Sequence, residues 1–113
     1  MPISKVYANL SCADLGDSAT WFATIFGRPA DRAPMTGLQE WDCGDGGFQL
    51  FQKPEDAGRG TLTLMVDDLE AERARLETAG LSMPGIETAD YTDIMRLRDP
   101  DGNLVVLAHP HPG

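Results

Sequence analysis

The sequence predicts an α+β fold of two tandem β–α–β–β–β modules, whose curved mixed sheets surround a cleft. Three observations predict it. Residues 5–12 and 61–66 alternate along their length, and each stretch leads directly into a helix-starting sequence. The pattern of elements then repeats, and the chain closes on the hairpin turn Asp99–Gly102 between apolar stretches. A chain of 113 residues suits one domain, with one module over about residues 1–54 and another over about 58–113.

The first module is predicted to start with a two-faced strand. Residues 5–12 place Val6, Ala8, Leu10 and Cys12 on one face and Tyr7, Asn9 and Ser11 on the other. A helix follows, because apolar residues recur at helical spacing from Trp21 to Phe26 before Gly27, a typical C-cap. We expect a short or edge strand near residues 28–34, then strands over 38–43 and 48–52 around the turn at 44–47.

The second module repeats this order. Leu62, Leu64 and Val66 face away from Thr61, Thr63 and Met65 in the predicted strand. A capped helix should begin at Asp67-Asp68, with Glu70 reaching back to the Asp67 amide, and should run to Ala79. Residues 82–89 are a loop or edge strand, and residues 91–98 and 103–107 form the closing hairpin.

Composition restricts the partners and the compartment. A net charge of -9 argues against sequence-independent nucleic-acid binding and permits attraction of a cationic ligand, although acids also keep proteins soluble. No apolar run spans a membrane and the N-terminus lacks a signal peptide's apolar core, so we expect a cytoplasmic protein without membrane partners. Cys12 and Cys43 are interpreted as reduced, buried side chains. His109 and His111 fall in a tail expected to fray.

Three motifs in order carry a family resemblance. They are Ala13-Asp14-Leu15 with Ser18, Trp21 and Phe22; Val66-Asp67-Asp68-Leu69; and Arg98-Asp99-Pro100-Asp101-Gly102-Asn103. Together they resemble the vicinal oxygen chelate superfamily, which includes glyoxalase I, bleomycin-resistance proteins and ring-cleaving dioxygenases. The resemblance implies the two-module fold and a homodimer with clefts at or near the interface.

The same resemblance identifies four positions that hold a metal in other members. In this chain they are Tyr7, Gln49, Thr61 and Val106. Val106 cannot coordinate a metal, and neutral Thr and Gln oxygens are weak ligands. We therefore predict neither a metal nor another cofactor. The strand alternation predicts a cleft lined by Tyr7, Asn9, Trp41, Gln49, Phe51, Thr61, Thr63, Met65, Arg96 and Val106, although Trp41 can face either way.

The leading hypothesis is a metal-independent small-molecule-binding protein that sequesters an aromatic or cationic drug or metabolite. The alternative is a metal-free lyase or isomerase that uses Tyr7 or Arg96, and a metal-dependent glyoxalase-like enzyme ranks third. In a further alternative, the predicted cleft residues pack against each other or against a second chain and leave no cavity.

Overall fold

The computed structural model describes residues 1–111 and contains two four-stranded sheets and two α-helices. The first sheet contains β1 (Tyr7–Cys12), β2 (Arg32–Met35), β3 (Leu38–Cys43) and β4 (Gly46–Gln52). The second contains β5 (Thr61–Met65), β6 (Glu87–Thr88), β7 (Thr92–Arg98) and β8 (Leu104–Pro110). The helices are α1 (Leu15–Phe26) and α2 (Leu69–Thr78), and η1 (Pro54–Asp56) is a 3₁₀ turn.

Both sheets have the same topology. Their strand orders are β1-β4-β3-β2 and β5-β8-β7-β6, and in each sheet the first and last strands of the module pair in parallel. The remaining pairs are antiparallel, with the short β2 and β6 at the edges. The predicted α+β class and the tandem β–α–β–β–β modules are confirmed.

Helix α1 provides most of the aromatic core. Asp14 caps its start by accepting from the Asp17 amide at 3.0 Å, and Gly27 ends it in the left-handed conformation at φ 75°. Phe22 and Phe26 then pack against β4, where the Phe22 and Phe48 rings lie 4.9 Å apart. The helix covers only the end of β1, so Val6 is 70 % exposed although it shares the predicted apolar face with Leu10.

Helix α2 has a thinner apolar stripe, in which only Leu69 and Leu76 are buried. Its N-cap is Asp68, whose carboxylate accepts from the Ala71 amide at 3.0 Å; the predicted cap at Asp67 is therefore one residue early. The helix is held to α1 by Arg75. Its Nη1 and Nη2 donate to the Thr24 and Ile25 carbonyls at 2.8 and 2.7 Å, where α1 leaves carbonyl groups without helical partners.

The β7–β8 turn docks the second module on the first. Buried Asn103 donates from Nδ2 to the Ser11 carbonyl at 3.0 Å and accepts from the Gly60 amide at 2.8 Å. Asp101 accepts from the Ala13 amide at 3.1 Å and from the Ser18 hydroxyl at 3.1 Å. The predicted hairpin is thus also the joint between the modules.

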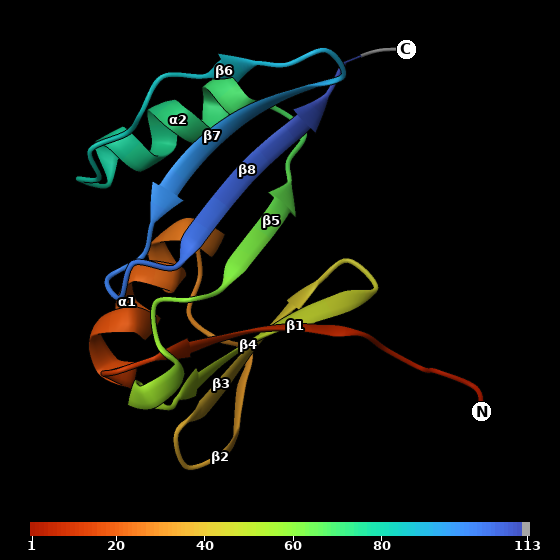
Figure 1. Cartoon of the computed structure of the whole chain (residues 1–113), viewed down its shortest axis with the longest axis vertical. Coiled ribbons are helices and arrows are strands. Elements are labelled where there is room, and N and C mark those ends of the chain that lie inside the picture. The colour runs from red at the N-terminus through yellow and green to blue at the C-terminus, as the bar shows by residue number, and fades with distance from the viewer. Residues whose placement is uncertain (112–113) are drawn as a thin grey trace.

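This joint sets the two sheets beside one another. β1 and β5 are the neighbouring edges (Figure 1), and the molecule measures 40 × 39 × 24 Å. The short dimension accommodates one sheet layer and one helix layer. The sheet faces opposite the helices therefore remain uncovered in the single chain, where Tyr7 is 37 % and Met65 62 % exposed.

The chain end is ordered through residue 111, so the predicted fraying is wrong for both histidines. β8 continues to Pro110 opposite Thr92, and the Nδ1 of His109 lies 2.8 Å from the Val66 carbonyl oxygen. The Nε2 of His111 lies 2.7 Å from an Asp93 carboxylate oxygen. Pro112 and Gly113 fall outside the described residues.

Two predictions from composition concern the thiols and the membrane. Cys12 is buried as predicted, whereas Cys43 is only partly buried, and both are free thiols. Burial raises the pKa of the Cys12 thiol to about 11, so it stays protonated at neutral pH. Within residues 1–111, neither helix has the length and apolar character needed to cross a bilayer.

Replacing Asn103 with Ala tests the joint. We expect Asn103→Ala to lower the free energy of unfolding by about 2–4 kcal/mol, because the Gly60 amide and the Ser11 carbonyl lose their partner. The control Asn9→Ala removes one exposed 3.3 Å hydrogen bond and should change the free energy of unfolding by less than about 0.5 kcal/mol. Urea unfolding measures both. Equal effects of the two substitutions would contradict the role of Asn103.

Asp93 should control the titration of His111. The hydrogen bond to Asp93 raises the pKa of His111, so the pair stabilises the fold below about pH 6.5, and this stability is lost as pH rises through the raised value. We expect Asp93→Asn to return the pKa of His111 toward its ordinary value in an NMR titration. Asp45→Asn, in the β3–β4 turn, should leave it unchanged. An unshifted His111 in Asp93→Asn contradicts the pairing.

Candidate functional site

The candidate site consists of the two sheet faces opposite the helices, here called face A and face B. Cross-strand register shows which side chains share each face. Face A of the first sheet carries Tyr7, Asn9, Ser11, Arg32, Leu38, Glu40, Asp42, Gln49 and Phe51. Face B of the second sheet carries Thr61, Thr63, Met65, Glu87, Ile94, Arg96, Arg98, Leu104 and Val106.

Nine of the ten predicted cleft residues lie on these faces. The structure brings four of them together on face A: Tyr7, Asn9, Gln49 and Phe51. It brings five together on face B: Thr61, Thr63, Met65, Arg96 and Val106. Contact of these residues with a ligand remains a prediction.

Trp41, which the sequence pattern allows on either side of β3, lies on the helix side, so its place among the predicted cleft residues is wrong. It is completely buried, and its ring lies 5.4 Å from that of Phe26 on α1. Its indole Nε1 donates to the Arg28 carbonyl at 3.0 Å. On β3 the alternation places Trp41 opposite Glu40 and Asp42, so the two acids occupy face A while the large apolar ring packs under the helix.

A hydrogen-bonded row crosses face A. Asn9 Nδ2 donates to Gln49 Oε1 at 3.3 Å, and Gln49 Nε2 donates to Glu40 Oε2 at 2.7 Å. Arg32 Nη1 closes the row on the other Glu40 oxygen at 3.3 Å. Glu40 is only 6 % exposed, so these partners supply the hydrogen bonds that a buried carboxylate requires.

A second row on face A is more exposed and more strongly ionic. Arg32 Nη2 lies 2.7 Å from one Asp42 oxygen, and Lys5 Nζ lies 2.8 Å from the other. These hydrogen bonds, from Arg32 first and then Lys5, hold the pKa of Asp42 well below its usual range. The Lys5 ammonium also lies 4.9 Å from the centre of the Tyr7 ring, a cation–π distance.

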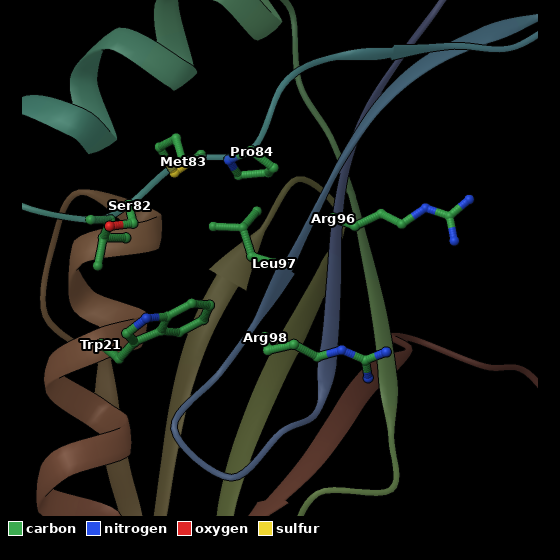
Figure 2. Close-up of a pocket in the computed structure, with 8 residues that line it drawn as sticks. Trp21, Ser82, Met83, Pro84, Arg96, Leu97 and Arg98 are labelled. Carbon is green, nitrogen blue, oxygen red and sulfur yellow. The ribbon is translucent and has the colours of Figure 1, made fainter.

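Face B is more apolar and carries two arginines. In one row, Arg96 on β7 lies beside Val106 on β8, and Val106 lies beside Thr63 on β5. The next row is Arg98, Leu104 and Thr61, on the same three strands. Figure 2 shows the Arg96 and Arg98 side chains pointing away from Leu97 and Trp21, which lie on the helix side of the sheet.

Two of the hollows beside the sheets are lined by residues of face B. One of about 450 Å³ lies on the helix side of β7, between Trp21, Leu97 and the 81–84 loop, and Figure 2 shows that the Arg96 and Arg98 side chains point out of it. The other, of about 710 Å³, lies between the modules, with Phe26 and Arg75 on one side and Thr63 and Met65 on the other. The predicted site residues Thr63 and Met65 line the second hollow, whereas Arg96 lines the first but directs its side chain away from it.

The donor set does not fit a divalent metal. The four equivalent positions present a phenol at Tyr7, an amide at Gln49, a hydroxyl at Thr61 and an isopropyl group at Val106. Gln49 is already hydrogen-bonded to Asn9 and Glu40. Among residues 1–111, no group of three or more His, Cys, Asp or Glu side chains is arranged to hold a metal ion.

Sequence reasoning omitted several polar residues of the two faces. Lys5, Arg32, Glu40 and Asp42 complete the rows of face A, and Arg98 extends face B. The sequence contains a signal for two pairs of these residues: Glu40 and Asp42, and Arg96 and Arg98. The members of each pair are two positions apart on a predicted strand, and such residues lie on the same face of the sheet. Arg32 and Lys5 reach face A only through tertiary pairing.

Comparisons with known proteins agree with the observed fold. Residues 7–108 match the model of the glyoxalase-like domain family. No curated protein sequence matches the chain. A glyoxalase/bleomycin resistance protein from Catenulispora acidiphila has a similar structure, with a TM-score of 0.84, 22% identity, and coverage of 93% of this chain and 96% of that one.

Two further solved structures are similar. A lactoylglutathione lyase from Agrobacterium tumefaciens has a TM-score of 0.77 and 19% identity, over 96% of this chain and 95% of that one. A bleomycin-binding protein, in complex with bleomycin, has a TM-score of 0.76 and 21% identity, over 92% and 95%. At these identities the similarity demonstrates the common fold.

The ionic row of face A predicts how Asp42 titrates. Arg32→Gln should raise the pKa of Asp42 toward its usual value, incompletely because Lys5 remains. Since the folded-state pKa is lowered, Asp42 stabilises the fold above about pH 4, and this stability is lost as pH falls through the lowered value. Carbon-13 NMR of the carboxyl group measures it, with Arg73→Gln on α2 as the control. An unchanged Asp42 titration in Arg32→Gln contradicts the row.

Proposed function

Because this chain belongs to the glyoxalase-like domain family of the vicinal oxygen chelate superfamily, we propose that it is a metal-independent small-molecule-binding protein. In this proposal it sequesters a drug or metabolite and leaves the compound chemically unchanged. The residues that form its site are the nine predicted side chains on faces A and B, together with their cross-strand partners.

The observation that carries the proposal is Val106. It lies in the middle row of face B, between Thr63 on β5 and Arg96 on β7, at the position where the family resemblance implies a glutamate ligand. An aliphatic group there supports contact with an apolar ligand and supplies no electron pair to a metal. Leu104, in the next row, extends the same apolar floor.

A homodimer gives these faces a function. Tyr7, Asn9, Thr61, Thr63 and Met65 are exposed in the single chain, which buries neither face. We propose that a second copy covers the faces and that the ligand is held between them. Enclosure supports affinity, because small-molecule sites bury most of the ligand surface. Sedimentation equilibrium that finds only monomer at micromolar concentration would contradict this arrangement.

The sequence suggests an aromatic or cationic ligand, and two features support testing both kinds. Tyr7 and Phe51 offer aromatic surface on face A, and the net charge of -9 attracts cations at long range. A cytoplasmic location also remains a prediction; the free thiols of Cys12 and Cys43 are compatible with a reducing compartment.

Calorimetric titration with metal-free bleomycin and with aromatic antibiotics tests the proposal. Trp41 is buried under α1 and Trp21 lies on the helix side, so heat is a better readout than tryptophan fluorescence. We expect saturable binding that survives dialysis against a chelator, with the compound recovered unchanged. Thr63→Trp should weaken it at least about tenfold by filling face B, whereas Thr20→Trp, on the exposed surface of α1, should not.

Three results would contradict the proposed function or favour one of its alternatives. No saturable heat with any of these compounds contradicts a binding role. A converted compound supports the metal-free lyase or isomerase, with turnover then expected to depend on Tyr7 or Arg96. Stoichiometric zinc, nickel or manganese retained after dialysis supports a metal-dependent glyoxalase-like enzyme and contradicts metal independence.

A further inference from the structure

The acidic side chains of faces A and B are each paired with a basic side chain. On face A, Glu40 and Asp42 share Arg32, and Lys5 adds a second cation beside Asp42. On face B, Glu87 lies 3.1 Å from Arg96. The net charge of -9 therefore arises from carboxylates elsewhere, and at the candidate site itself the acids are neutralised.

Arg98 is the exception among the basic side chains of the two faces. It makes no ion pair within residues 1–111, and its side chain is exposed. Within the described residues its side chain makes one hydrogen bond, from Nη1 to the Gly102 carbonyl at 3.1 Å. A guanidinium carries five N–H donors in a planar fork, so most of this donor capacity faces solvent.

Arg96 stands beside it as a second cation. The two arginines lie two residues apart on β7 and project from the same face (Figure 2). Both partners of the Arg96–Glu87 ion pair are more than half exposed, and such pairs contribute little stability. An incoming anion can therefore exchange with Glu87 at small cost.

The surroundings of the arginines suit an apolar ligand with one charged end. Leu104 and Val106 on β8 are the direct cross-strand partners of Arg98 and Arg96 on β7. Beyond them on β5, Thr61 and Thr63 have exposed side chains whose hydroxyls have no partner within residues 1–111. The face therefore combines an aliphatic strip, two free hydroxyls and a guanidinium without a carboxylate.

We propose that face B recognises an organic carboxylate, with Arg98 as the anchor for the carboxylate and the Leu104–Val106 strip as the floor for the apolar body. This inference rests on the proposed binding function and names the class of its ligand. The overall negative charge affects approach over long distances, whereas a bidentate contact with Arg98 determines which group is held at the site.

Three matched probes test the charge of the ligand: 2-naphthoate, neutral 2-naphthamide and cationic 2-naphthylmethylammonium, titrated into the full-length protein by calorimetry. We expect 2-naphthoate to bind most tightly. Arg98→Gln should weaken 2-naphthoate about tenfold and leave 2-naphthamide unchanged. Glu87→Gln should strengthen 2-naphthoate, because it releases Arg96.

Lys53→Gln is the control, because it removes the same charge at an exposed pair with Asp56, outside both faces. It should leave all three affinities unchanged, and thermal melts should show each variant folded. Tightest binding of the ammonium, or a carboxylate preference that survives Arg98→Gln, overturns the inference. If bleomycin or 2-naphthamide binds but 2-naphthoate binds no more tightly, the carboxylate inference is wrong and the proposed binding function stands. If none of these compounds binds, both the inference and the proposed function are wrong.

Discussion

The docking of the β7–β8 turn on the first module is the interaction on which the rest of the structure depends. Asn103 satisfies backbone groups of both modules, and Asp101 binds the start of α1. Gly58 fits only without a side chain, because a Cβ there would lie 2.5 Å from the Asp101 carbonyl oxygen. Arg75 on α2 donates hydrogen bonds to two carbonyl groups at the other end of α1, so the modules are joined at two places.

This joint has a consequence for function. Because the modules meet along the β1 and β5 edges and share a helix layer, both faces opposite the helices stay open. Side chains on both faces are exposed in the single chain, among them Tyr7 on face A and Met65 on face B. In the proposed function, a second copy covers these faces and the ligand lies between them.

The two faces divide the chemistry between them. Face A carries a network in which Arg32 connects Glu40 to Asp42, and such a network restricts the positions of its side chains. Face B has an aliphatic floor and an arginine, Arg98, that makes one side-chain hydrogen bond and no ion pair within the described residues. The chain shares its fold with a lactoylglutathione lyase and a bleomycin-binding protein, and the positions considered for a metal carry Tyr7, Gln49, Thr61 and Val106.

The sequence by itself determined the strands, the helices, the repeat and the sheet face of nine of the ten predicted site residues, because alternation and capping are local signals that survive folding. The family resemblance, and not the sequence pattern, implies that Val106 lies where other members have a metal ligand. Only the tertiary structure decided the side of Trp41, since either face of β3 satisfied the pattern until α1 packed on one. Only cross-strand pairing brought Arg32 to Glu40 and left Arg98 without an acid, because ion pairs depend on distances between strands that no local pattern contains.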